Sequence, residues 1–161
     1  MQLVIISGRS GSGKSIALQA LEDIGYYAID NLPAMLLGSL VDELRNSPTI
    51  QTSIAVSIDA RNLPHALERF PRLLEELRTN QVDCQIVYLT TDARILLERY
   101  SATRRRHPLT RGRDMTLNEA IESEDATLSD IRNLADLIID TSRLSVHDLR
   151  GRITEQVASH R

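Results

Sequence analysis

An eight-residue segment near the amino terminus has the residue types and spacing of a phosphate-binding loop. Residues 8–15 read Gly-Arg-Ser-Gly-Ser-Gly-Lys-Ser and match G-x-x-x-x-G-K-[ST] at every fixed position. Glycines let the backbone curl tightly, so that successive N–H groups can face phosphate oxygens. In this pattern the Lys14 ammonium reaches the β- and γ-phosphates, and the Ser15 hydroxyl is a ligand of Mg²⁺. The segment predicts a nucleoside triphosphate site with Mg²⁺, formed by Gly8, Arg9, Ser10, Gly11, Ser12, Gly13, Lys14 and Ser15.

Two aspartates are candidates for the carboxylate that such a site usually includes. Asp59 follows the apolar run 54–58, and Asp30 follows the run 26–29. A carboxylate at the end of a neighbouring strand holds Mg²⁺ through water and helps to place the attacking oxygen. Either side chain is also suited to capping the helix that follows it. We expect Asp59 to serve as the metal-site and catalytic carboxylate, with Asp30 as the alternative.

A strongly basic segment lies directly before a strongly acidic one. Residues 99–113 contain six arginines and no acid, whereas residues 114–130 contain six acids and no base. Three interpretations remain open: a lid that neutralises charge in the transition state, a contact with RNA or another partner, and a pair of solvated faces. In a lid, the catalytic arginines are expected to be Arg104, Arg105 and Arg111.

Short β-branched apolar runs alternate with longer segments of helical period along the whole chain. This pattern indicates an α/β domain with a mostly parallel sheet. The expected strands are Gln2–Ser7, Tyr26–Ile29, Thr52–Ile58, Cys84–Leu89 and Leu137–Ile139. The expected helices are about Lys14–Ile24, Pro33–Arg45, Pro64–Thr79, Asp92–Arg105, Leu117–Leu134 and Val146–Ala158. The predicted fold class is a kinase-like P-loop NTPase, with five strands and helices on both faces of the sheet.

The composition limits the classes of function. A chain of 161 residues with 42% hydrophobic residues and a formal charge of −3 corresponds to one globular domain. Only 3% of the residues are aromatic, which argues against a stacking platform for single-stranded nucleic acid. The single cysteine, Cys84, excludes an internal disulfide and fits a reducing compartment. The apolar start is too short for a signal peptide or membrane span, so we expect a cytoplasmic protein without membrane association.

Six blocks of sequence together resemble those of a known family, the RapZ (RNase adapter protein) family, also called YvcJ-type nucleotide-binding proteins. The blocks are Ile6–Ser15, Ala20–Tyr27, Asp30–Pro33, Ser57–Asn62, Arg99–Leu109 and Ala135–Ser142. Among them, Asp-Asn-Leu-Pro at 30–33 and Arg-Arg-x-His-Pro-Leu at 104–109 are far more specific than the phosphate loop alone. The resemblance covers most of the chain.

The resemblance implies a protein that binds ATP and GTP and hydrolyses them weakly. It assigns Gly8–Ser15 to ATP and the block Asp59, Ala60, Arg61 and Asn62 to guanine nucleotide, beside the metal role expected for Asp59. Family members continue into a C-terminal part that binds small regulatory RNAs and presents them to a ribonuclease. Residues 1–161 are therefore expected to form the nucleotide-binding domain of a longer protein. A homo-oligomer is among the assemblies that the sequence permits.

Two other functions remain open. In a small-molecule kinase, Asp30 would be the base, and the residues near 26–33 would hold the acceptor. In an RNA-binding adapter, the loop would bind phosphate without turnover. Finally, Asp140, Thr141 and Ser142 follow the last strand on the ligand edge, where they either approach the base or cap the helix that begins near Val146.

Overall fold

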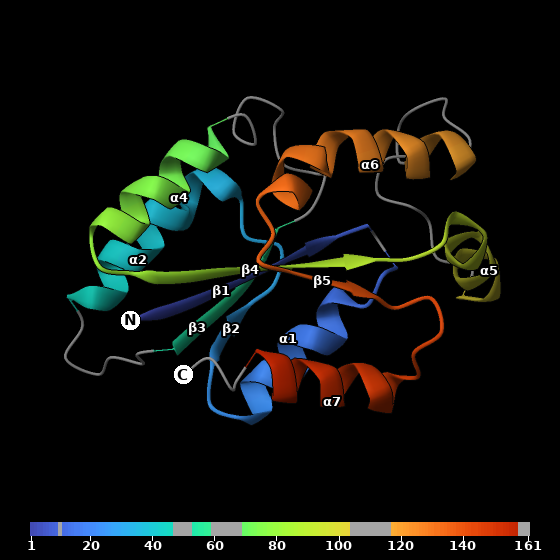
Figure 1. Cartoon of the computed structure of the whole chain (residues 1–161), viewed down its shortest axis with the longest axis horizontal. Helices are drawn as coiled ribbons and strands as arrows, with labels where there is room; N and C mark the ends of the chain where they lie inside the picture. Colours follow the sequence, from blue (N-terminus) through green and yellow to red (C-terminus); the bar gives the residue numbers. More distant parts are fainter. Residues whose placement is uncertain (10, 47–52, 59–68, 104–116, 158–161) are drawn as a thin grey trace.

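A sheet of five parallel strands forms the middle layer of the domain in the computed structural model (Figure 1). The structure describes residues 1–9, 11–46, 53–58, 69–103 and 117–157. The strands are β1 (Gln2–Gly8), β2 (Tyr27–Ile29), β3 (Ser53–Ile58), β4 (Asp83–Thr90) and β5 (Leu137–Asp140). Their order is β2-β3-β1-β4-β5, so β1 lies at the centre of the sheet. The carboxyl ends of all five strands share one edge, and the loop that follows β1 opens there.

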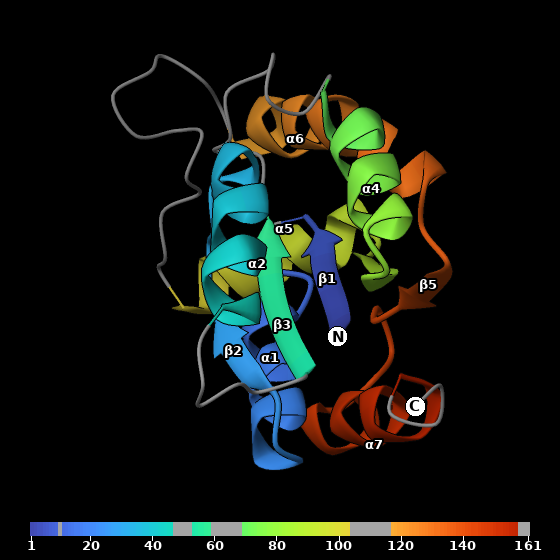
Figure 2. The same cartoon turned by 90° about the vertical axis from the view of Figure 1, so that its left-hand side faces the viewer.

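Helices cover both faces of the sheet (Figures 1 and 2). One face carries α1 (Lys14–Asp23) and α7 (Val146–Gln156), and the other carries α2 (Leu37–Arg45), α4 (Phe70–Thr79) and α6 (Leu117–Asn133). A 3₁₀ turn, η1 (Ala34–Leu36), precedes α2, and α5 (Ala93–Thr103) follows β4 at the carboxyl end of the sheet. This layered arrangement confirms the expected α/β fold class.

Two hydrophobic clusters hold the layers together, one on each face of the sheet. Successive side chains of a strand point to opposite faces, so β1 sends Leu3 and Ile5 into one cluster and Val4 and Ile6 into the other. The first cluster packs against α2, α4 and α6, and the second against α1 and α7. Both faces of β1 are therefore buried and shielded from solvent, as in most parallel sheets. This burial fixes the strand that leads into the phosphate loop.

The expected strands are confirmed, and the ends that the structure describes differ by one residue at most. One expected helix was wrong in part, because residues 33–45 form η1 and then α2 rather than a single helix. Pro33 is extended at ψ 129°, so regular helix begins only after the 3₁₀ turn. The first residues of the helix expected from Pro64 and the last of the one expected to reach Arg105 lie outside the described ranges. Within those ranges, no helix has the length and apolar character needed to cross a membrane.

Candidate functional site

The phosphate loop joins the end of β1 to the first turn of α1, and glycine is required where it begins. Gly8 has φ +149° and pairs with Leu89 of β4. A Cβ on Gly8 would lie 2.3 Å from the Leu89 carbonyl oxygen and 2.9 Å from Ser12 Oγ. Gly11 and Gly13 also have positive φ, +87° and +109°, which L side chains rarely adopt. The tight turn predicted from the sequence is therefore confirmed.

The described groups of this loop suit an anion. Ser12 is fully buried, and its hydroxyl has no hydrogen-bond partner within the described part of the chain. Lys14 is the first residue of α1, and its Nζ donates to the Gly8 carbonyl oxygen at 2.8 Å, so this side chain lies across the loop. The first N–H groups of a helix have no intrahelical acceptor, and the first turn of α1 contains no acid to neutralise them. An ammonium, a helix N-terminus and an unpartnered hydroxyl thus meet at one loop, and this combination suits the binding of phosphate.

Hydrogen bonds tie the loop to the carboxyl ends of β4 and β5. Thr141 Oγ1 donates to the Ser12 carbonyl oxygen at 2.7 Å, and Arg9 Nη1 donates to the Thr91 carbonyl oxygen at 3.4 Å. The Asp92 N–H donates to Ser142 Oγ at 2.8 Å, which links the segment after β4 to the segment after β5. The sequence had placed residues 140–142 on the ligand edge, but the contact between Thr141 and the loop was not foreseen.

The N-terminus of α7 is capped by residues other than 140–142, for which capping was one of the two roles considered. Ser145 Oγ accepts from the Asp148 N–H at 3.0 Å, and Asp148 Oδ2 accepts from the Ser145 N–H at 3.2 Å. This capping box satisfies two donors at the start of the helix. Asp140 instead accepts from Ser142, and hydrogen bonds from the Ser142 hydroxyl and N–H lower the pKa of Asp140. Capping of α7 by residues 140–142 was therefore wrong, because Ser145 and Asp148 perform it.

Asp30 lies where predicted, at the carboxyl end of β2, and is held by a serine that sequence reasoning missed. Ser57 Oγ of β3 donates to Asp30 Oδ1 at 2.5 Å and accepts from the Asn31 N–H at 2.7 Å. Asn31 has φ +56°, a conformation that asparagine tolerates better than most residues. Neither η1 nor α2 has a side-chain cap, so Asp30 does not have the capping role considered for it. The one local signal for Ser57 is a polar residue directly after the apolar run Ile54–Val56.

The strand order places Asp30 and the phosphate loop on the same edge of the sheet. One strand, β3, separates β2 from β1. Because neighbouring strands lie about 4.8 Å apart, the axes of β2 and β1 are separated by roughly 10 Å. Asp30 is exposed at this edge, so its second carboxylate oxygen can meet a ligand.

Several predicted site residues lie outside the described ranges: Ser10, Asp59, Ala60, Arg61, Asn62, Arg104, Arg105 and Arg111. Their roles therefore stay predictions. Of the two expected Mg²⁺ ligands, Ser15 is described and exposed at the start of α1, and Asp59 is not described. The described residues contain no group of three or more His, Cys, Asp or Glu that could hold a metal ion. A single hydroxyl beside bound phosphates is compatible with Mg²⁺, which keeps several waters and takes few protein ligands.

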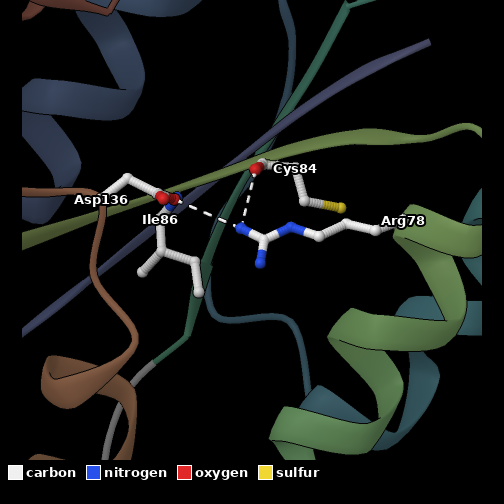
Figure 3. Close-up of polar contacts among 4 residues, drawn as sticks. All are labelled: Arg78, Cys84, Ile86 and Asp136. Atoms are coloured by element: carbon white, nitrogen blue, oxygen red, sulfur yellow. Dashed lines mark hydrogen bonds and ion pairs between the residues drawn. The ribbon is translucent and has the colours of Figure 1, made fainter.

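The opposite edge of the sheet holds a structural cluster (Figure 3). Arg78 of α4 donates to the Cys84 carbonyl oxygen at 3.2 Å and pairs with Asp136 at 3.5 Å. Asp136 Oδ2 also accepts from the Ile86 N–H at 2.8 Å, so the cluster joins α4, β4 and the start of β5. Burial raises the pKa of the Cys84 thiol to about 11, although Arg78 acts in the opposite direction. Cys84 is therefore a buried neutral thiol. A cavity of about 600 Å³ opens at this edge, away from the phosphate loop.

Comparison with known protein families and curated proteins gives a consistent result. The family model described as the RapZ-like N-terminal domain matches residues 1–161. A nucleotide-binding protein of Chromohalobacter salexigens is 74% identical over 99% of this chain and 54% of its own length. A nucleotide-binding protein of Pseudomonas putida is 54% identical over 95% of this chain and 54% of its own length. The chain thus spans about half the length of these relatives.

Solved structures with a similar fold are P-loop proteins of low sequence identity. The YorR protein of Bacillus subtilis, in complex with phosphorylated GDP, gives a TM-score of 0.63 at 19% identity, covering 98% of this chain and 96% of YorR. A gluconokinase of Sinorhizobium meliloti gives a TM-score of 0.60 at 16% identity, covering 99% of this chain and 93% of the gluconokinase. A shikimate kinase of Bacteroides thetaiotaomicron gives a TM-score of 0.59 at 14% identity, covering 97% of this chain and 98% of the kinase. These similarities support the kinase-like P-loop fold.

Proposed function

Because this chain belongs to the RapZ-like N-terminal domain family, we propose that it binds ATP or GTP together with Mg²⁺ and hydrolyses the bound triphosphate slowly. The observation that carries this proposal is the complete phosphate loop between β1 and α1, with Gly8 against β4 and Lys14 at the helix start. The relatives from Chromohalobacter and Pseudomonas carry the name nucleotide-binding protein, which supports the same class of ligand.

The backbone N–H groups, Lys14 and Ser15 of the loop have separate roles in this proposal. The N–H groups of the loop and of the first turn of α1 bind phosphate oxygens, and Lys14 exchanges its bond to the Gly8 carbonyl for the β- and γ-phosphates. Ser15 would offer its hydroxyl to Mg²⁺, which would supply neutralisation of phosphate charge. In hydrolysis, a water oxygen bonds to the γ-phosphorus as the bond to the bridging oxygen breaks. The bridging oxygen keeps the electron pair and leaves on nucleoside diphosphate, and the proton that the water loses passes to the released phosphate.

The remaining roles concern residues outside the described ranges. We expect Asp59 to organise Mg²⁺ or the attacking water, and Asp59–Asn62 to contact guanine nucleotide. Arg104, Arg105 and Arg111 would neutralise charge on the transferred phosphate from a lid. If Arg104→Ala and Arg105→Ala lower turnover more than affinity, this role is supported. A fall in affinity alone would remove these arginines from the transition state.

The proposal extends to the longer protein that the relatives represent. The chain spans about half of their length. We propose, as the family resemblance of the sequence implies, that its nucleotide state regulates an RNA-binding part that hands small regulatory RNAs to a ribonuclease. The family resemblance of the sequence supports this cytoplasmic adapter role. RNA binding by the longer protein, measured at two salt concentrations with and without nucleotide, tests it. Equal RNA affinity in all nucleotide states would contradict regulation by nucleotide.

Calorimetry with ATP and GTP tests nucleotide binding directly. Lys14→Ala removes the ammonium from the loop and is expected to abolish binding of both nucleotides while the circular dichroism spectrum stays unchanged. Arg152→Ala is the matched control, because Arg152 is exposed on α7 and its loss also removes one positive charge. Equal affinity in the wild type and the Lys14 variant would refute the proposed site.

A small-molecule kinase is the second candidate, and the contact between Asp30 and Ser57 favours it. Ser57 occupies one carboxylate oxygen of Asp30, so the other can accept the proton of an acceptor hydroxyl. A screen of small metabolites with labelled ATP distinguishes phosphate transfer from phosphate release. Transfer that Asp30→Asn abolishes would establish a kinase, whereas release of phosphate alone would support the hydrolase.

A further inference from the structure

Two buried threonines connect the phosphate loop to the carboxyl ends of β4 and β5. Thr91 follows β4 and is 3% exposed, and Thr141 follows β5 and is 2% exposed. Their hydroxyl oxygens lie 2.6 Å apart, and Thr141 Oγ1 lies 2.7 Å from the carbonyl oxygen of Ser12. Hydroxyls buried to this degree are costly without hydrogen bonds. The loop carbonyl and the two hydroxyls therefore form one chain of hydrogen bonds.

The direction of donation along these hydrogen bonds follows from counting the protons of the hydroxyls. Each threonine hydroxyl has one proton to donate. The carbonyl oxygens of Ser12 and Thr90 can only accept and lie 2.7 Å and 3.4 Å from Thr141 Oγ1, so the proton of Thr141 lies on the shorter bond, to Ser12. Thr91 must then donate its own proton to Thr141 Oγ1. The order of donation is Thr91 to Thr141 to the Ser12 carbonyl.

The sheet itself fixes the position of Thr141. Its backbone N–H donates to the Thr90 carbonyl oxygen at 2.8 Å, and the preceding residue, Asp140, pairs with Thr90 in the parallel ladder. Thr141 therefore continues the β5 pairing by one residue, so its backbone cannot move without disturbing the sheet, and its hydroxyl is held by the bonds to Thr91 and Ser12. A rigid donor of this kind holds the loop carbonyl in one orientation.

A fixed carbonyl also fixes the next N–H group. The peptide group is planar and trans, so the C=O of Ser12 and the N–H of Gly13 point in opposite directions. Thr141 binds the carbonyl, and the Gly13 N–H is thereby turned away from β5. Among the described residues, this N–H has no hydrogen-bond partner. It is thus available to a phosphate oxygen in the loop.

We propose that Thr141, supported by Thr91, is a positioning residue that aims the Gly13 N–H of the phosphate loop at bound phosphate. The proposal rests on the proposed binding of nucleotide by this loop. It predicts that removal of the Thr141 hydroxyl weakens the phosphate contacts of a ligand and leaves the contacts of its base unchanged. Nothing in the loop pattern itself includes either threonine, because they lie 50 residues apart in the chain and far from residues 8–15.

Hydroxyl-to-methyl substitutions in the full chain test the proposal, with calorimetric titrations of ATP, GTP and inorganic tripolyphosphate. Thr141→Val keeps the side-chain shape and is expected to raise Kd about tenfold for all three ligands, which corresponds to about 1.4 kcal/mol. Thr141→Ser retains the hydroxyl and should bind within about twofold of the wild type, and Thr91→Val should show a loss of about threefold. Thr154→Val is the control, because Thr154 donates to Arg150 on the exposed side of α7.

The outcomes separate positioning from simple stabilisation. A Thr141→Val protein that melts earlier but binds all three ligands like the wild type would overturn the proposal. So would a variant that loses affinity for ATP but not for tripolyphosphate, because the effect would then lie outside the phosphates. If Thr141→Val fails to fold, Thr91→Val decides the question by the same titrations. A wild-type chain that binds none of the ligands would instead refute the proposed function.

Discussion

Replacement of Gly8 by alanine is the sharpest test of how the phosphate loop is built. The added Cβ would lie 2.3 Å from the Leu89 carbonyl oxygen, a backbone atom of β4 that cannot move without disturbing the central sheet. Gly8 also has φ +149°, which disfavours any side chain. We expect about 2 kcal/mol from the clash and about 2 kcal/mol from the strained backbone. Gly8→Ala should therefore lower the free energy of unfolding by about 4 kcal/mol, a large part of the stability of a typical domain.

Two other glycines separate the two contributions. A Cβ on Gly25 would meet nothing within 4 Å, but this residue has φ +102°, so Gly25→Ala measures backbone strain alone. Gly151 lies within α7, has ordinary φ and has open space around its Cα, so Gly151→Ala measures neither effect. We expect a loss of about 2 kcal/mol for Gly25→Ala and a gain of up to about 1 kcal/mol for Gly151→Ala.

Urea denaturation followed by circular dichroism at 222 nm gives the free energy of unfolding for the wild type and the three variants. The reasoning requires Gly8→Ala to cost clearly more than Gly25→Ala. If the two variants differ by less than about 0.5 kcal/mol, the close approach of β1 and β4 at Gly8 has no energetic consequence. The explanation of this glycine by packing would then be refuted.

Three further predictions concern the rest of the fold. Ser145→Ala removes half of the capping box of α7 and should cost about 1 kcal/mol in the same denaturation assay; no change would show that the cap is energetically idle. The pKa of Cys84 is raised to about 11, so its contribution to stability is complete below about pH 9 and is lost as the pH rises towards 11. The wild type should thus lose about 2 kcal/mol more than Cys84→Ala between pH 8 and 10.5, and parallel pH profiles would contradict this. Arg150→Ala breaks an exposed ion pair with Asp23 that joins α7 to α1 and should cost less than about 1 kcal/mol; a larger loss of urea stability would show that this contact contributes more than a surface pair.

The phosphate loop and the strands could be predicted because their signals are local. Gly8, Gly13 and Lys14 lie within one short segment, and the requirement for tight backbone and a cation is visible in consecutive residues. The strands are apolar runs because helices cover both faces of the parallel sheet and bury successive side chains. Each run can therefore be told apart from the more polar segments on either side of it in the sequence. The start of one helix differed from the prediction, because Pro33 is extended and a 3₁₀ turn precedes the regular helix at Leu37.

The contacts that complete the candidate site depend on strand order, which no local pattern contains. Ser57 meets Asp30 because β3 lies beside β2, and Thr141 reaches Ser12, 129 residues earlier in the chain, because β5 ends beside the loop. Ser145 rather than residues 140–142 caps α7, because Asp140 and Thr141 bond to the end of β4 and Ser142 accepts from Asp92. The amino-acid sequence thus determined the phosphate-binding chemistry and the sheet-forming segments, since adjacent residues are sufficient for both. Only the tertiary structure decided which distant hydroxyls and carboxylates meet at the carboxyl edge, since their positions follow from the pairing order of the strands.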